Sequence, residues 1–497
     1  MKKSDKDSKS DNILQRPISR RTLLKGSIAT GIGGLLGGAL FRPRSGMALG
    51  GTTLKNKWRD RRRENGEFVV EQTRKIPIIR DIDVLVVGGG MAGVGAALAA
   101  GRMGAQTLLV ENYGCLGGTG TSGMVNNFCG YSSSSPGPFQ IVKGIGDDVL
   151  AHLWERHGNN TRTSTTFNPE ILKMVLDDMF AEDNVEVLFF TKMVDVIMER
   201  NTIKGVFIEN KGGRQAILAK RVCDCSGDGD VCARAGVPFE LGDGKGGFLA
   251  CDMAHHWVNV GSYSSAALSS AIANAIAAGD TRITRPTAIL QALPGISGSR
   301  WVNWAGVPWK VNGVNPFQLS KAAVDGRKVA NGLMEFCKEK MGDPFATAAV
   351  IDTAPMMGLR QTRRVMGDYL LNEEEVLDGV KFTDGIGACA WPIEVVDPDP
   401  LKGRTFLNLR KGGDYYLIPY RIVLPKGVEN LTMAGRFVSC TFFAQASTRV
   451  MGPAVVMGQA IGTASVMSIE RGVSPRYLNV GDLQQELIND GAFLPLP

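Results

Sequence analysis

The segment that most constrains the fold is 84–111, where two apolar runs flank a glycine turn and a run of small residues. The order predicts a buried strand, a tight turn, a helix, and a second strand with Glu111 at its tip. That combination is typical of a βαβ unit that binds a dinucleotide. Gly88 permits the turn, Gly90 lets the backbone approach a pyrophosphate, and Gly93 lets the helix lie close to the sheet.

The chemistry of this unit depends on the helix N-terminus and on the acid. A helix N-terminus offers free N–H groups and partial positive charge to a pyrophosphate, and Glu111 can accept a hydrogen bond from a ribose hydroxyl. The flanking strands and the acid make the pattern more specific than a lone glycine motif. The alternative is a glycine-rich turn in an ordinary α/β domain.

The N-terminus predicts export. Ser19, Arg20, Arg21 and the residues to 25 form a twin-arginine signal, and the apolar stretch 26–41 follows it. Sixteen residues are short for a membrane span, and small residues at 46–48 suit cleavage. Twin-arginine export carries proteins that have already folded, which agrees with a cofactor loaded before transport. The alternatives are an amphipathic anchor or an uncleaved signal anchor.

These features make the twin-arginine machinery an expected partner and the periplasm, or another extracytoplasmic space, the expected location. No stable membrane span is expected in the mature chain. The first 48 residues hold ten Lys/Arg and three Asp/Glu, so they account for the formal charge of +7 of the chain. The remainder is balanced, which argues against nucleic acid or anionic lipid as a partner.

Nine cysteines are scattered without a CxxC pair, and no four of them have iron–sulfur or zinc spacing. With only four histidines in the chain, no metal site is expected. Cys223 and Cys225 would alternate along one strand with both side chains on one face, which indicates core. Cys115 and Cys129 flank a glycine-rich loop. Each is a candidate for covalent cofactor attachment, with a buried unreactive cysteine as the alternative.

The chain is long enough for two or three domains. We expect a signal peptide at 1–48, a linker at 49–80, and a nucleotide-binding domain in two parts, 81–249 and 415–497, the second with a C-terminal tail. Residues 250–414 differ in composition from the rest of the chain, because they carry five of the seven tryptophans and mixed polar runs. This difference predicts an inserted cap or substrate domain.

Local patterns also predict individual helices, loops and strands within 81–249 and 415–497. Residues 168–183 predict a capped helix, and a small-residue helix is expected from about Pro453 to Glu470. A glycine-rich loop at 114–123 can follow a cofactor closely, and a second glycine-and-acid turn lies at 226–230. Strands are predicted at 185–190, 194–198, 204–209 and 216–225.

Taken together, separated motifs in a fixed order carry a resemblance to a known family. They are the 86–90 turn, Glu111 with the 113–118 loop, 226–230, 358–369, 418–421, 434–436 and 447–451. The chain resembles FAD-dependent oxidoreductases related to the flavin subunit of heterodisulfide reductase, in the glutathione-reductase-like superfamily. The match covers about residues 82–490.

The resemblance implies an α/β fold: a Rossmann-like FAD-binding domain of the glutathione-reductase-like type with an inserted α+β substrate or cap domain. It implies FAD as the resident cofactor. It places a helix that starts near Pro453 with its positive end toward the pyrimidine edge of the flavin ring. The residues implied to bind the cofactor are Gly88, Gly90, Gly93, Glu111, Gly117, Gly118, Thr119, Asp228, Gly435, Arg436, Arg449, Gly452 and Pro453.

The chain departs from its relatives in three ways. Gly452 stands between the Arg-Val-Met triplet and Pro453, where relatives place proline directly. The tandem cysteines of an iron–sulfur subunit are missing, and no cysteine pair follows Thr119, so a dithiol relay is not expected.

Several side chains are candidates for proton transfer or for binding an anionic substrate. His255, His256, Tyr420 and Tyr369 could move a proton, and Arg360, Arg363, Arg364 and Arg449 could clamp a carboxylate; structural roles are the alternative for each. The expected function is an exported FAD enzyme that transfers hydride or electrons between a small organic substrate and FAD. The alternative is a flavin-bearing electron-transfer or escort subunit without its own substrate. Whether a redox partner protein is involved stays an open question.

Overall fold

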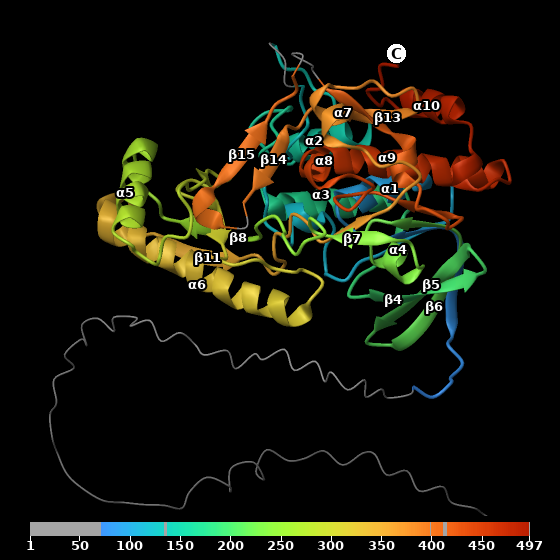
Figure 1. Cartoon of the computed structure of the whole chain (residues 1–497), viewed down its shortest axis with the longest axis horizontal. Helices are drawn as coiled ribbons and strands as arrows, with labels where there is room; N and C mark the ends of the chain where they lie inside the picture. The colour runs from blue at the N-terminus through green and yellow to red at the C-terminus, as the bar shows by residue number, and fades with distance from the viewer. Residues whose placement is uncertain (1–70, 134–136, 398, 411–414, 497) are drawn as a thin grey trace, which may run out of the picture. The chain divides into compact units, whose positions relative to one another are not determined.

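A single mixed sheet of seven strands organises the nucleotide-binding part of the protein (Figure 1). The computed structural model describes residues 71–133, 137–397, 399–410 and 415–496, so the predicted export signal lies outside the described residues. The strand order is β3-β2-β1-β6-β5-β4, and β17 pairs with the end of β6. The strands are β1 (Ile78–Val87), β2 (Thr107–Val110), β3 (Glu186–Leu188), β4 (Lys192–Glu199), β5 (Thr202–Asn210), β6 (Gly213–Asp224) and β17 (Leu431–Met433).

Strand direction divides this sheet into two regions. β1, β2, β3, β6 and β17 run parallel to one another, whereas β4, β5 and the first part of β6 form an antiparallel meander. The last four residues of β1 are all buried, as expected for a strand covered on both faces. The sequence prediction of an α/β fold is confirmed, and its strands and helices lie close to their predicted positions.

The register brings four chain segments to one edge of the sheet. Val87 of β1 pairs with Val110 of β2 and with Asp224 of β6, and Asp224 pairs with Met433 of β17. The residues that follow these four positions therefore emerge side by side at the carboxyl ends of parallel strands. In open α/β sheets this edge is where ligands bind.

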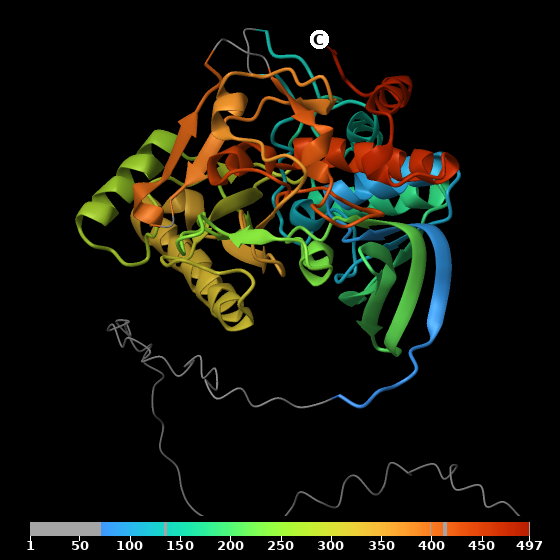
Figure 2. The ribbon, with the colours of Figure 1, turned by 45° about the vertical axis from the view of Figure 1, so that its right-hand side comes forward.

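Two helices of small residues pack together beside this edge. α1 (Met91–Arg102) follows the first glycine turn, and α9 (Met451–Glu470) is buried over nearly its whole length. α9 contacts α1, the sheet and α10, and Figures 1 and 2 show the two helices side by side. The other helices of this part are α2 (Ile145–Glu155), α3 (Pro169–Glu182), α4 (Asp230–Arg234), α7 (Glu373–Leu377), α8 (Phe442–Thr448) and α10 (Val480–Asn489).

The predicted helices at 168–183 and near Pro453 are both present. Asn168 caps α3 by accepting a hydrogen bond from the Glu170 N–H. α9 begins at Met451, two residues before Pro453. The earlier start is compatible with proline because the first-turn positions of a helix need no backbone N–H. α9 is also the one helix in the described part that is long and apolar enough to cross a membrane, but it lies inside the fold.

A second sheet of four strands, in the order β11-β8-β10-β9, lies with two helices in the predicted cap segment, and we call this part the cap region. Figure 2 shows its two long helices in yellow-green and yellow, apart from the main sheet. Two separate apolar clusters, drawn almost entirely from 251–359, form its core, whereas apolar residues from Val365 onward belong to the main core. The cap boundary near residue 414 stays a prediction. The elements are β8 (Asp252–Val258), β9 (Leu290–Gln291), β10 (Arg300–Gly306), β11 (Ala349–Thr353), α5 (Ser265–Ala277) and α6 (Pro316–Met341).

Three strand pairs connect the two regions. β7 lies beside the second glycine turn, and β14 carries residues toward the cap. The pairs are β7 (Phe239–Leu241) with β12 (Arg363–Val365), β13 (Gly385–Cys389) with β16 (Tyr416–Pro419), and β14 (Ile393–Val396) with β15 (Arg404–Leu407). Short 3-10 helices lie at Gly118–Gly120, Asp343–Phe345, Pro400–Lys402, Tyr420–Val423 and Pro475–Tyr477.

Candidate functional site

The first glycine turn connects β1 to α1 and is shaped by close backbone approaches. Gly88 has φ +102°, and a Cβ at this position would lie 2.4 Å from the Cys225 carbonyl oxygen. A Cβ on Gly93 would lie 1.8 Å from the Gly88 oxygen, so the first turn of α1 can lie against the glycine turn only without a side chain. At Gly90, in contrast, an added Cβ meets no protein atom within 4 Å. The backbone at Gly90 therefore faces open space.

Glu111 ties the end of β2 to this turn. Its side chain is 8% exposed. One carboxylate oxygen accepts the Gly89 N–H at 2.6 Å, and the other accepts the Tyr113 N–H at 2.8 Å. Burial raises the pKa of Glu111 against these hydrogen bonds. The acid thus holds the turn, and its contact with a ribose stays a prediction.

The loop after Glu111 lies directly on the first glycine turn. Gly117 has φ +95° and donates its N–H to the Gly89 oxygen at 2.8 Å. A Cβ on Gly118 would lie 2.8 Å from the Gly90 Cα, so the glycines permit contact between the two backbones. Gly117 and Thr119 continue the open surface that begins at Gly90.

The second glycine-and-acid turn follows β6 and is built around a fully buried carboxylate. Asp224 accepts the Ser226 N–H at 3.0 Å and the Cys232 N–H at 2.9 Å. Asp228 pairs with Arg436 at 2.6 Å. Arg436 lines the open surface, whereas Asp228 is not among the lining residues. The contact of Asp228 with the cofactor stays a prediction.

These segments enclose one side of a cavity of about 470 Å³. The cap sheet and β14 supply the opposite side. Three buried N–H groups on its wall, those of Arg436 Nε, Arg449 Nε and Trp391 Nε1, have no hydrogen-bond partner in the described part of the chain. The lining includes Gly90, Met91, Gly117, Thr119, Asn127, Cys129, Cys225, Gly227, Asp252, Gln291, Trp301, Asn303, Arg360, Trp391, Glu394, Arg404, Gly435, Arg436, Arg449, Val450, Met451 and Ala454.

The N-terminus of α9 opens on this cavity. Val450 caps the helix without a side-chain hydrogen bond, and Val450, Met451 and Ala454 all line the cavity. Gly452 donates its N–H to the Cys129 oxygen at 3.0 Å. The positive end of the helix dipole therefore faces the cavity, where it favours negative charge on a bound group.

Two buried carboxylates on the cap side are each held by arginines. Arg449 and Glu394 are both 9% exposed and pair at 2.9 Å. Asp252, at the start of β8, pairs with Arg285 at 2.8 Å and also with Arg360. Burial alone would raise the pKa of each carboxyl, but the arginines outweigh it and the pKa of both is lowered. Both acids are therefore ionised at neutral pH.

The structure brings some of the predicted side chains together and separates others. Arg360 and Arg449 lie on the cavity wall, whereas His255, His256 and Tyr420 are not among its lining residues. His256 pairs with Asp352 at 2.9 Å. Tyr420 donates its hydroxyl to the Pro475 oxygen at 3.0 Å. The geometry therefore gives these three side chains no contact with a molecule in the cavity.

Position along β8 explains why the two histidines miss the site. β8 lies between β10 and β11, and adjacent side chains in a strand point to opposite faces. His255 is fully buried on the face it shares with Trp257, and its Nδ1 lies 3.2 Å from the Met253 oxygen. The cavity reaches only the beginning of the strand, where Asp252 lies.

The remaining arginine and tyrosine candidates hold other parts of the fold. Arg363 pairs with Asp230, and Arg364 with Glu240. Tyr369 donates to Glu375. These three candidates are outside the cavity lining.

The cysteine candidates differ in position. Cys115 lies 3.3 Å from the Ser122 hydroxyl and is outside the lining, whereas Cys129 is on the wall. Burial raises the pKa of Cys129 to about 12, so its thiol stays protonated and lacks the thiolate that attachment chemistry requires.

Several cavity residues were absent from the sequence prediction. Asp252, Glu394, Arg404 and Trp301 come from β8, β14, β15 and β10, which are brought together by antiparallel pairing. Only the density of tryptophans in 250–414 pointed to this region. Of the predicted cofactor residues, Gly90, Gly117, Thr119, Gly435, Arg436 and Arg449 line the cavity, whereas Gly88, Gly93, Glu111, Gly118, Asp228, Gly452 and Pro453 shape its walls from behind.

Comparison with known proteins identifies the family. The family model described as FAD dependent oxidoreductase matches residues 83–487, and the chain belongs to this family. It is an FAD-dependent enzyme. The donor set agrees with this assignment, because bare glycine backbone, a helix N-terminus and unpartnered buried N–H groups suit an extended anionic cofactor.

The chain is also similar, at low sequence identity, to several solved structures. A geranylgeranyl bacteriochlorophyll reductase-like protein from Thermoplasma acidophilum is 13% identical, with 83% of this chain and 84% of that chain covered and a TM-score of 0.41. The p-nitrophenol 4-monooxygenase from Pseudomonas putida is 13% identical, with 84% of this chain and 88% of that chain covered and a TM-score of 0.42. The anhydrotetracycline hydroxylase from Streptomyces rimosus is 11% identical, with 82% of this chain and 65% of that chain covered and a TM-score of 0.41.

Proposed function

We propose that this enzyme transfers hydride or electrons between a small organic substrate and bound FAD in the cavity described above. The observation that carries the proposal is the composition of the two cavity walls. One wall is glycine backbone and the α9 N-terminus, and the other is made of cap side chains such as Asp252, Trp301 and Asn303. A compartment with a second, chemically different wall has a place for a substrate as well as for the cofactor.

The residues divide into two roles. Gly90, Gly117, Arg436 and the first turn of α9 would hold FAD, which supplies hydride or electron chemistry when bound. Arg449 adds a buried positive charge next to the helix N-terminus, and Glu394 fixes its position. Trp301 and Trp391 add aromatic surface to the wall.

The alternative is a flavin-bearing electron-transfer or escort subunit without its own substrate. The two functions differ in what reduces the flavin. The purified protein should be mixed anaerobically with a panel of small metabolites, in the absence of any protein partner, while flavin absorbance is followed. Bleaching by one metabolite supports the enzyme; bleaching only by a reduced protein partner would favour the carrier.

We further propose the glutathione-reductase-like arrangement and a relation to the flavin subunit of heterodisulfide reductase. A parallel sheet joined to a β4-β5-β6 meander, two glycine turns and a buried C-terminal helix support the former. The latter rests on the sequence motifs alone.

Finally, we propose that the protein is exported by the twin-arginine route to the periplasm or another extracytoplasmic space. Arg20 and Arg21, the apolar stretch 26–41 and the small residues 46–48 support this proposal.

A further inference from the structure

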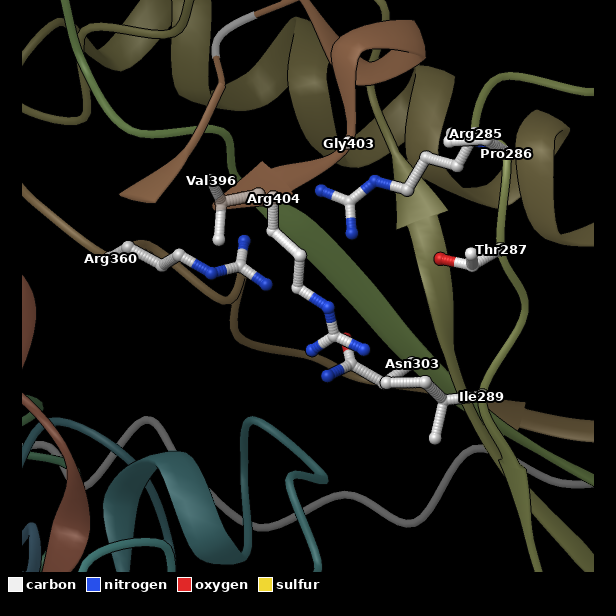
Figure 3. A pocket seen from close by; sticks show the side chains of 9 residues that line it. All are labelled: Arg285, Pro286, Thr287, Ile289, Asn303, Arg360, Val396, Gly403 and Arg404. Atoms are coloured by element: carbon white, nitrogen blue, oxygen red, sulfur yellow. The ribbon is translucent and has the colours of Figure 1, made fainter. Parts of the chain in front are cut away.

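A small hollow opens from the cap side of the large cavity and is dominated by arginine. It measures about 20 Å³ and shares Ile289, Asn303, Arg360 and Arg404 with the lining of the cavity, so the two spaces lie next to each other. Figure 3 shows the guanidinium groups of Arg285 and Arg360 pointing toward the side chain of Arg404. We call Arg285, Arg360 and Arg404 the arginine pocket. No carboxylate is among the described residues that line this hollow.

The positive charge around the hollow exceeds the negative charge. The three arginines of the pocket and Arg449 pair with only two carboxylates, Asp252 and Glu394, each of which contacts two of them. Both acids are ionised, and arginine does not lose its proton in proteins. The six side chains therefore carry a net charge of +2, although each arginine contacts a carboxylate. This excess positive charge favours an anion in the hollow.

Hydrogen bonding gives the same indication. Arg285 is 11% exposed, and its Nε atom is buried without a hydrogen-bond acceptor in the described part of the chain. Its Nη2 atom lies 2.8 Å from Asp252 Oδ1 in the ion pair, so Nε is the donor left without an acceptor. Buried guanidinium donors are normally satisfied, and an anion with two oxygens matches their geometry.

We propose that the arginine pocket binds the carboxylate of an organic-acid substrate whose remaining part extends into the large cavity. The size of the hollow favours this group, because one water needs about 10–15 Å³ and a carboxylate has only two oxygens to place. Asn303, at the junction with the cavity, can orient the same group. The inference rests on the proposed function and specifies its substrate class.

Binding of matched acids and amides to the FAD-loaded enzyme tests the proposal without turnover. The probes are benzoate and acetate, with benzamide and acetamide as uncharged counterparts, and binding is measured by calorimetry and by perturbation of the flavin spectrum. We expect each acid to bind at least about tenfold more tightly than its amide. Equal affinity of acid and amide overturns the proposal. Inorganic phosphate binding more tightly than either acid overturns the carboxylate assignment.

Variants locate the binding group. Arg285→Gln should weaken benzoate at least about tenfold and leave benzamide unchanged. Arg404→Gln should do the same, and its side chain is 38% exposed, so folding depends on it less. The control is Arg282→Gln, because Arg282 pairs with Asp280 at 2.6 Å and is outside the pocket lining. Wild-type benzoate affinity in both pocket variants overturns the proposal.

The test separates this inference from the proposed function. If neutral compounds reduce the flavin and acids do not bind, the arginine pocket is overturned and the proposed function is retained. If acids bind selectively and no metabolite reduces the flavin, the pocket is supported and the proposed function is overturned.

Discussion

His255 illustrates how burial alone can make a histidine a pH-sensitive element of stability. Burial lowers its pKa to about 4, with a smaller contribution of the same sign from His256 and an opposing one from Asp352. In the unfolded chain its pKa returns to about 6.5. Between pH 6.5 and 4 the unfolded state binds a proton that the folded state does not. The stability that neutral His255 allows is therefore present above pH 6.5 and is lost as the pH falls toward 4.

We predict that His255→Phe flattens this part of the stability profile. The wild-type free energy of unfolding should fall by up to about 3 kcal/mol more than that of the variant between pH 7 and 4. Denaturant titrations at several pH values measure the difference. His157→Asn, at an exposed position, is the control and should keep the wild-type slope. Parallel slopes for His255→Phe and wild type would contradict the assignment.

Gly90 offers a test of the cofactor site that does not depend on stability. Its backbone is extended, with φ −68° and ψ 177°, and an added Cβ contacts no protein atom. Gly90→Val should therefore fold normally, yet its side chain would occupy the space of the pyrophosphate. We predict a colourless protein, with Gly90→Ala intermediate. The ratio of flavin to protein absorbance measures the effect, and full flavin content in Gly90→Val would move the binding turn elsewhere.

At the scale of elements, glycines decide how closely α1 and α9 pack. A Cβ on Gly458 would lie 2.1 Å from the Ala92 oxygen, and one on Gly462 would lie 2.3 Å from the Ala96 oxygen. Both glycines are on the face of α9 that contacts α1, four residues apart. Because backbone atoms cannot yield as a flexible side chain can, a methyl group here must push the helices apart.

We predict that Gly462→Ala lowers the free energy of unfolding by about 1–3 kcal/mol through overpacking. The control is Gly332→Ala in the middle of α6, where the nearest atom to an added Cβ is 3.5 Å away. That variant should gain up to about 1 kcal/mol, because alanine is the better helix former. Thermal or denaturant unfolding compares them, and equal effects would show that α1 and α9 can separate without cost.

At the scale of the molecule, the sequence predicted the nucleotide-binding half far better than the cap. Glycine turns, apolar strands and helix caps are set by the local spacing of residues. The positions of β1, α1 and α3 could therefore be predicted from the sequence. The cap wall depends on antiparallel register across distant segments. Asp252, Arg285 and Glu394 meet only after folding, and no local pattern marks them. His255 and His256 attracted attention through their chemistry, but the strand that carries them presents only its first residue to the cavity.

The same long-range assembly bears on export. The cavity combines residues from 90–129, 225–252, 289–303, 358–404 and 435–454, so a complete FAD site exists only in the folded chain. A route that carries folded proteins would therefore preserve a cofactor bound in the cytoplasm.

Arg20→Lys with Arg21→Lys should retain folded, yellow precursor in the cytoplasm, because the receptor reads the arginine pair. Arg42→Lys with Arg44→Lys, beyond the apolar stretch, should export normally. Cell fractionation with flavin fluorescence measures both, and periplasmic accumulation of the Arg20/Arg21 variant would reject the twin-arginine proposal.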